Sequence, residues 1–224
     1  MCLVCCGKKK KRRVVVIDNE EDESVQPSKS LLTAEPRHAL PKTSTKFVFL
    51  GDPGCGKTSI IKKSTINLFN EHEVPSNGID FKPVGTLVNG EEHKLMLWDT
   101  PGKDRLGSRL NDDFFRNTDC YVIVYDLTNG VSCHNVKRWL KRIDALPTPN
   151  GSPKAHRLLV GNKFDLMTTR AMETELLMQL VEQVDDYVET SAYDGQNLDK
   201  LLKRMTIIAT ERRGQKKLKK KQKT

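Results

Sequence analysis

The stretch Gly51–Thr58 has the residue types and the spacing of a phosphate-binding loop. Its sequence, GDPGCGKT, matches the pattern G-x-x-x-x-G-K-S/T, in which glycines let backbone N–H groups wrap around a phosphate. In such a loop Lys57 would reach the outer phosphates, and the hydroxyl of Thr58 would bind Mg²⁺. A glycine-rich turn with a chance Lys-Thr pair has the same letters, so the other parts of a nucleotide site decide between the two interpretations.

A second motif, Asp99-Thr100-Pro101-Gly102, has the form D-x-x-G and follows the apolar run 93–98. The carboxylate of Asp99 is suited to Mg²⁺, and the backbone N–H of Gly102 can face a γ-phosphate. The two motifs together would hold a metal ion and a triphosphate from two different loops.

Two further motifs would select the base. In Asn162-Lys163-Phe164-Asp165, of the form N-K-x-D, the carboxylate can accept hydrogen bonds from two adjacent N–H groups of guanine, a donor pair that adenine lacks. Ser191-Ala192 offers backbone N–H groups toward a purine carbonyl oxygen. Each motif alone is weak, but their order and their placement predict a guanine-nucleotide site and argue against an ATPase or kinase.

Each of these motifs follows an expected strand. Hydrophobic patterns predict strands at 46–50, 79–88, 93–98, 120–125, 157–161 and 187–190, and helices from 59 and at 133–146, 171–183 and 197–212. Alternation of strands and helices predicts an α/β doubly wound fold of the P-loop NTPase type, with six mostly parallel strands and helices on both faces. Asn89-Gly90 is a hairpin signal, which predicts one antiparallel edge strand. Ligands are expected at the carboxyl ends of the strands.

The charge of the chain is concentrated at its two ends. Of the 224 residues, 38 are Lys or Arg and 29 are Asp or Glu, which gives a net charge of +9. Residues 1–13 hold six of the basic residues and residues 212–224 hold eight, without a single acidic residue in either stretch. The remaining 24 basic and 29 acidic residues leave residues 14–211 with a net charge near −5. We therefore expect a mildly acidic domain with two cationic tails.

The three cysteines at the N-terminus, Cys2, Cys5 and Cys6, stand beside the basic run 8–13 and are candidates for S-palmitoylation. A solvated basic arm with incidental thiols, or a nuclear-localisation signal, is the alternative interpretation. Residue 2 is Cys, so N-myristoylation is not expected. The six cysteines show neither a disulfide framework nor metal-ligand spacing, which indicates a reducing compartment, cytosolic or nuclear.

The motifs and their order resemble the Ras superfamily of small GTPases, and within it the Rab branch most closely. The likeness covers about residues 46–208. It is carried by Gly51–Thr58, Gly78–Phe81, Trp98–Gly102, Phe114–Arg116, Val124–Asp126, Asn135-Val136 with Trp139, Gly161–Asp165 and Glu189–Ala192. The resemblance divides the chain into an N-terminal arm with a disordered linker at 1–45, a GTPase domain at 46–211 and a polybasic tail at 212–224.

The resemblance implies a switch, in which GTP and Mg²⁺ order two loops, about 69–81 and 99–116, that bind effectors, exchange factors and GTPase-activating proteins. Phe69 would pack edge-on to the guanine ring, and Ser76 would supply a second hydroxyl to Mg²⁺ beside Thr58 and Asp99. Contacts with GTP or GDP are expected at Gly51, Asp52, Pro53, Gly54, Cys55, Gly56, Lys57, Thr58, Ser59, Phe69, Ser76, Gly102, Asn162, Lys163, Asp165, Ser191, Ala192 and Tyr193.

Three residues depart from the family pattern. The family places a glutamine after the glycine of D-x-x-G to orient the attacking water, and this chain has Lys103. We assign catalysis to Lys103, Gly102 and Lys57, and expect slow intrinsic hydrolysis. Ser76 replaces a threonine, and Pro53 lacks the N–H that other residues would offer in the phosphate loop. A pseudo-GTPase scaffold held in one nucleotide state is therefore the alternative function.

The tails suggest where the protein acts. The last cysteine is Cys133, so the C-terminal prenylation of Ras and Rab proteins is not expected. Acylated N-terminal cysteines and two basic tails would anchor the protein to an anionic leaflet, on the cytoplasmic face of the plasma membrane or an endomembrane. The alternative is a nuclear or nucleic-acid-associated GTPase. Neither tail contains the aromatic residues that stack on bases, which argues against a nucleic-acid partner.

Overall fold

The computed structural model describes residues 44–73, 78–88, 91–101, 112–147, 153–169 and 174–221. Several residues discussed above lie outside these ranges. They are Cys2, Cys5, Cys6, Ser76, Asn89, Gly90, Gly102 and Lys103. Predictions about those residues remain predictions.

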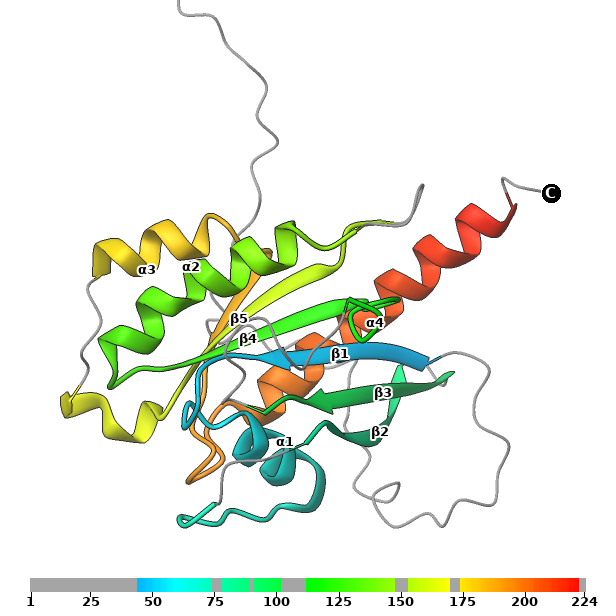
Figure 1. Ribbon diagram of the computed structural model, residues 1–224. Coiled ribbons are helices and arrows are strands. Elements are labelled where there is room, and N and C mark those ends of the chain that lie inside the picture. Colours follow the sequence, from blue (N-terminus) through cyan, green and yellow to red (C-terminus); the bar gives the residue numbers. More distant parts are fainter. Residues whose placement is uncertain are drawn as a thin grey trace, which may run out of the picture.

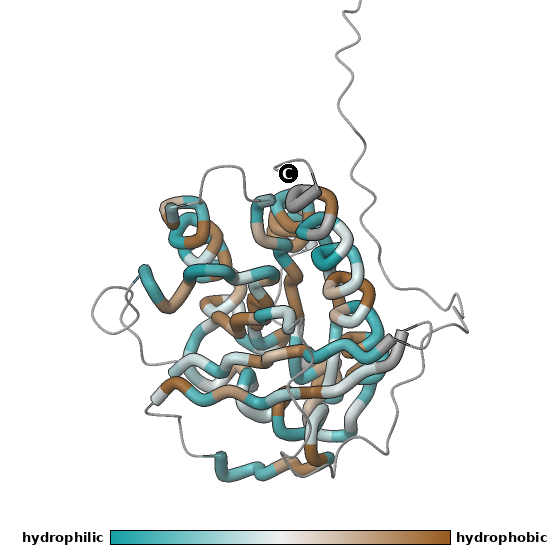
Figure 2. Tube along the Cα trace, turned by 90° about the vertical axis from the view of Figure 1, so that its right-hand side faces the viewer, coloured by the Kyte–Doolittle hydropathy of each residue, from teal (hydrophilic) through white to brown (hydrophobic). Residues whose placement is uncertain are grey.

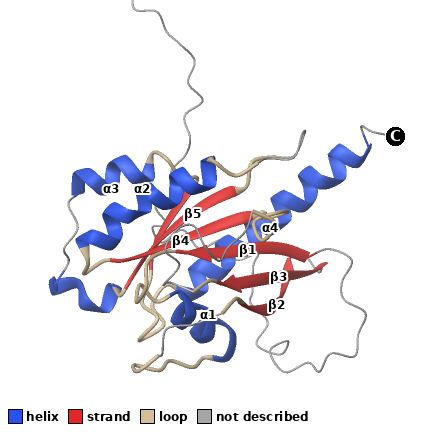
Figure 3. Ribbon diagram, in the orientation of Figure 1, coloured by secondary structure: helices blue, strands red, loops and turns tan. Residues whose placement is uncertain are grey.

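One six-stranded sheet forms the centre of the domain (Figures 1 and 3). In chain order its strands are β1 (Ser44–Leu50), β2 (Asp80–Val88), β3 (Glu91–Asp99), β4 (Cys120–Asp126), β5 (His156–Asn162) and β6 (Asp186–Glu189). The spatial order is β2-β3-β1-β4-β5-β6; β2 pairs antiparallel to β3, and every other pairing is parallel. The predicted fold, mostly parallel with one antiparallel edge strand, is confirmed.

Helices cover both faces of the sheet. The α-helices are α1 (Lys57–Ile66), α2 (Gly130–Asp144), α3 (Thr174–Val181) and α4 (Leu198–Lys221), and a short 3₁₀ helix spans Phe164–Thr169. Figure 1 shows α2 and α3 on one face and α1 and α4 on the other. In Figure 2 the helices carry both hydrophobic and hydrophilic residues, as helices with one buried side do.

Strand β1 shows how two cores arise from one sequence. Successive side chains of a strand point to opposite faces. Phe47 and Phe49 therefore join the core beneath α1 and α4, while Val48 and Leu50 join the core beneath α2. Because both faces are covered, even consecutive residues of this strand are apolar and buried.

Several helix boundaries differ from those predicted: α1 begins two residues earlier than 59, and α2 and α3 each end two residues earlier than 146 and 183. Helix α2 begins at Gly130 rather than 133, because the Asn129 side chain accepts hydrogen bonds from the N–H groups of Val131 and Ser132. Helix α4 continues to Lys221, whereas we expected it to end at 212. Lysine, arginine and glutamine are good helix formers, so the first part of the basic tail extends the last helix of the domain. Within the described residues, no helix is both long and apolar enough to cross a bilayer.

Candidate guanine-nucleotide site

The phosphate loop lies between β1 and α1, at the carboxyl end of the central strand. Two of its glycines have positive φ angles and no room for a side chain. A Cβ on Gly51 (φ +144°) would lie 2.1 Å from the Val124 carbonyl oxygen, and a Cβ on Gly56 (φ +95°) would lie 2.1 Å from Asn162 Nδ2. These contacts explain why the loop requires glycine at both positions.

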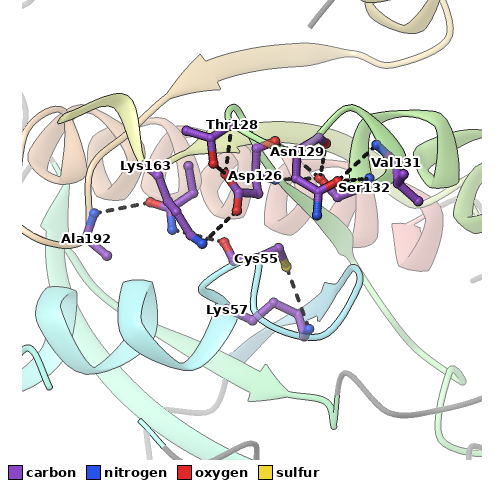
Figure 4. Close-up of polar contacts among 10 residues, drawn as sticks. Cys55, Lys57, Asp126, Thr128, Asn129, Val131, Ser132, Lys163 and Ala192 are labelled. Carbon is purple, nitrogen blue, oxygen red and sulfur yellow. Dashed lines mark hydrogen bonds and ion pairs between the residues drawn. The ribbon is translucent and has the colours of Figure 1, made fainter. Parts of the chain in front are cut away.

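The backbone of the phosphate loop accepts hydrogen bonds from the lysine of the motif. The ammonium group of Lys57 donates to the carbonyl oxygens of Gly51 at 2.8 Å and Asp52 at 3.0 Å, and the residue is 4% exposed. The thiol of Cys55 lies 3.8 Å from the same ammonium (Figure 4). Burial raises the pKa of this thiol above its usual value, so Cys55 packs as a neutral group. Pro53 and Gly54 are exposed at the tip of the loop, and Ser59 is half-buried.

Two oxygen ligands suited to a cation meet beside the loop. The hydroxyl of Thr58, in the first turn of α1, donates to Asp99 Oδ2 at 2.5 Å, at the end of β3. The other oxygen, Asp99 Oδ1, is buried and has no hydrogen-bond partner among the described residues, and burial raises the pKa of this carboxyl. Such a carboxylate would be stabilised by a bound cation, so the two residues fit Mg²⁺.

Thr58 and Asp99 would supply only part of a coordination shell for the cation. Among the described residues, no group of three or more His, Cys, Asp or Glu side chains could hold a metal ion. Mg²⁺ fits this arrangement, because it keeps waters and binds through one or two protein ligands plus substrate phosphates. The third predicted ligand, Ser76, lies outside the described residues, as do Gly102 and Lys103.

Asn162, at the end of β5, joins the phosphate loop to the loop after β6. Its Nδ2 donates to the Cys55 carbonyl oxygen at 3.0 Å, and its Oδ1 accepts from the Ala192 N–H at 3.2 Å. Figure 4 shows the two partners, Cys55 in the phosphate loop and Ala192 in the loop after β6. This side chain therefore connects the phosphate end of the site to the base end through hydrogen bonds.

The base end brings together the remaining predicted residues. The hydroxyl of Ser191 donates to Asp165 Oδ1 at 2.6 Å, which orients the carboxylate expected to recognise guanine. Lys163 has a positive φ of 68°. The rings of Phe69 and Tyr193 meet edge to face, with centroids 5.4 Å apart and an interplanar angle of 89°. Tyr193 is 61% exposed, so this aromatic pair forms part of the surface.

Sequence reasoning missed the role of Asp126, at the end of β4. One oxygen of this buried carboxylate lies 2.6 Å from Lys163 Nζ, and the other accepts from the N–H and hydroxyl of Thr128. Asp126 thus holds the lysine of the N-K-x-D motif. Its position directly after an apolar strand was the available signal, since the functional loops follow the strand ends.

Two residues of α2 were also missed. Asn135 and Trp139 both donate to the carboxylate of Asp52 in the phosphate loop. In the sequence they mark the resemblance to the family, and their distance from the loop along the chain gives no reason to expect contact.

Comparisons with known proteins agree with this geometry. The model of the Ras family matches residues 46–210. Ras-related protein RABD2a of Arabidopsis thaliana is 32% identical over 168 residues, which cover 75% of this chain and 80% of that protein. GTP-binding protein ypt1 of Schizosaccharomyces pombe is 31% identical, over 75% of this chain and 81% of the relative. Ras-related protein Rab-27A of Rattus norvegicus is 34% identical, with 75% and 79% covered.

The matched region contains the sheet except for the first two residues of β1, together with the phosphate loop and both base-binding motifs. The chain therefore belongs to the Ras family of small GTPases, close to the Rab branch.

Proposed function

We propose that this protein is a GTP/GDP switch that acts in signalling or membrane trafficking. The observation that carries the proposal is the convergence of Lys57, the Thr58–Asp99 pair and Asp165 at one edge of the sheet. GTP or GDP would lie along this edge with Mg²⁺ beside the outer phosphates. The bound cation would neutralise phosphate charge, while Lys57 would bind the phosphates and Asp165 would orient the base.

The nucleotide content of the protein tests this proposal directly. Purified without added nucleotide and then denatured, the protein is expected to release a guanine nucleotide and no adenine nucleotide. Release of GDP would favour a cycling switch, and release of GTP would favour a form that needs a partner for turnover. An empty site, together with no binding of added GTP, would contradict the proposal.

Hydrolysis is proposed to be slow because Lys103 has no acceptor to hold the attacking water. We expect a single-turnover rate at or below roughly 10⁻⁴ s⁻¹, the order of intrinsic Ras hydrolysis. Lys103→Gln should raise this rate, because a glutamine can orient the water. A wild-type rate far above this level, unchanged in Lys103→Gln, would contradict the assignment. The combination of Lys103 and Ser76 also supports the alternative of a scaffold held in one nucleotide state.

The tails are proposed to hold the switch on the cytoplasmic face of a membrane, with a nuclear location as the alternative. Acylation at Cys2, Cys5 and Cys6 together with basic residues would supply two anchoring signals, which stable attachment requires. Replacement of all three cysteines by serine should move the protein from the membrane fraction to the supernatant. Unchanged fractionation would contradict the lipidation proposal. Effectors, exchange factors and GTPase-activating proteins would contact residues 69–81 and 99–116.

A further inference from the structure

The carboxylate of Asp52 is held by the helix on the other side of the phosphate loop. Asn135 Nδ2 donates to Asp52 Oδ2 at 2.6 Å, and Trp139 Nε1 donates to Asp52 Oδ1 at 3.2 Å. Each carboxylate oxygen therefore has its own donor from α2. Hydrogen bonds to a charged group are the stronger ones in proteins, so the two donors hold the Asp52 carboxylate against α2.

The two donors are well placed to act together. Asn135 and Trp139 are four residues apart in α2, and residues at this spacing lie on the same face of a helix. Trp139 is 4% exposed and packs in the core beneath the helix. Because its ring is fixed by this packing, the direction of its N–H group is fixed as well. The cap at Asn129 further holds the start of the helix.

The backbone of Asp52 faces the opposite way, into the phosphate loop. Its carbonyl oxygen accepts from Lys57 Nζ at 3.0 Å and from the Cys55 N–H at 3.4 Å. A single residue thus connects α2, through its side chain, to the lysine of the phosphate site, through its carbonyl. A shift of Asp52 would alter the position of Lys57.

The charge of Asp52 gives a second reason for the contact. The carboxylate belongs to a loop that wraps around anionic phosphates, and like charges a few ångströms apart repel each other. Asn135 and Trp139 direct the carboxylate toward the helix while satisfying both of its oxygens. Without them, the carboxylate would be free to turn toward the phosphates.

We infer that Asn135 and Trp139 are positioning residues of the phosphate site: they hold the Asp52 carboxylate against α2 and thereby set the loop and Lys57 for nucleotide binding. This inference rests on the proposed function. Neither residue touches the nucleotide in this role. Their loss should weaken retention of the phosphates and leave recognition of guanine by Asp165 intact.

The test measures dissociation of a fluorescent GDP and a fluorescent non-hydrolysable GTP analogue from the full chain. Asn135→Ala removes one donor, and Trp139→Phe removes the other while keeping an aromatic ring in the core. Arg138→Ala is the matched control, since Arg138 lies on the same helix and its side chain is exposed. We expect Asn135→Ala to speed release of the GTP analogue by about tenfold, because the change removes one charge-assisted hydrogen bond. Release of GDP should change less.

A double-mutant cycle separates positioning from a merely structural role. In the Asp52→Ala background the acceptor is gone, so Asn135→Ala should add little to the dissociation rate. A structural role would instead give additive effects, with lower thermal stability in both backgrounds. Rates of Asn135→Ala and Trp139→Phe equal to the Arg138→Ala control, or additive effects with Asp52→Ala, would overturn the inference. Failure of the wild-type protein to bind any guanine nucleotide would overturn the proposed function and this inference with it.

Discussion

Thr58 and Asp99 are 41 residues apart in sequence, but their oxygen atoms lie 2.5 Å apart at the end of the sheet. This contact explains how two weak motifs would make one cation site. The Thr58 hydroxyl can be removed by substitution. Thr58→Ala should lower the affinity for Mg²⁺ by at least about tenfold, because it removes a proposed ligand and the orienting partner of Asp99. The measurement is the Mg²⁺ concentration that halves the rate of GDP release.

Ser64→Ala provides the control for this change. Ser64 is also a hydroxyl residue of α1, and its buried Oγ has no hydrogen-bond partner within the described structure. Its replacement should leave the dependence on Mg²⁺ unchanged. Equal Mg²⁺ affinity in Thr58→Ala and Ser64→Ala would rule out the assignment of Thr58.

Three cysteines of the domain are buried: Cys55 is 1% exposed, and Cys120 and Cys133 are 0% exposed. Burial raises the pKa of Cys55 and Cys120, and only the thiolate reacts readily with alkylating reagents. In the Cys2/Cys5/Cys6→Ser variant, we therefore predict alkylation of the folded protein at pH 8 to be roughly a hundredfold slower than in urea. A native rate within tenfold of the urea rate would contradict this prediction.

The same pKa shifts give a sign for the dependence of stability on pH. At high pH the unfolded thiols ionise first, near their ordinary pKa, while Cys55 and Cys120 stay protonated in the folded state. The folded state then binds more protons than the unfolded state. The contribution of these two groups to stability is therefore full below the ordinary pKa of a thiol. It is lost as the pH rises from that value through the raised pKa values of the folded state.

At the scale of elements, α4 differs most from the sequence expectation. The first part of its basic end contacts the domain: Arg212 is 7% exposed and donates to the Lys154 carbonyl oxygen, and Lys216 pairs with Asp119 at 2.6 Å. Figure 1 shows the last turns of this helix extending beyond the strands. The Lys216 ion pair is half exposed and contributes little by itself, so helix propensity and the buried arginine favour the extension.

Gly214 allows a test of this helix. It lies inside α4, and an added Cβ would meet no atom of the described residues within 4 Å, apart from its chain neighbours and the backbone of its own helix. Gly214→Ala should stabilise the helix end by about 0.5–1 kcal/mol, since alanine loses less conformational entropy than glycine. Amide exchange of residues 212–218 should slow by about two- to fivefold. Unchanged exchange would mean that these residues are not stably helical.

Gly51→Ala, with its Cβ 2.1 Å from a carbonyl oxygen, should by contrast disrupt the phosphate loop.

The whole molecule combines an acidic domain with cationic ends. Basic residues near an anionic leaflet contribute on the order of 1 kcal/mol each, screened by salt. We predict that the protein binds vesicles containing phosphatidylserine and releases them as salt increases. Replacement of Lys8–Arg13 by glutamine should weaken this binding by at least about tenfold. Arg138→Gln with Lys141→Gln, which removes charge from the exposed side of α2, should weaken it much less per charge. Equal losses per charge would contradict a specific role of the tail.

The candidate site could be predicted because each part of a nucleotide site needs fixed residue types at short spacing. Lys57 and Thr58 belong to one motif, and Asp165 lies three residues after Asn162. The placement of every motif after an expected strand also predicted where they would gather, since parallel strands end at a common edge. The family comparison agrees with this interpretation over residues 46–210.

The sequence by itself thus determined the fold class, the phosphate loop and the expected preference for guanine, all of which depend on local patterns. Tertiary structure alone decided that α2 holds Asp52, that Asp126 holds Lys163, and that α4 continues through Arg212 to Lys221. The donors to Asp52 lie 83 and 87 residues away in sequence. The physical reason is that such contacts follow from how packed helices orient individual side chains, and residue spacing along the chain does not encode that orientation.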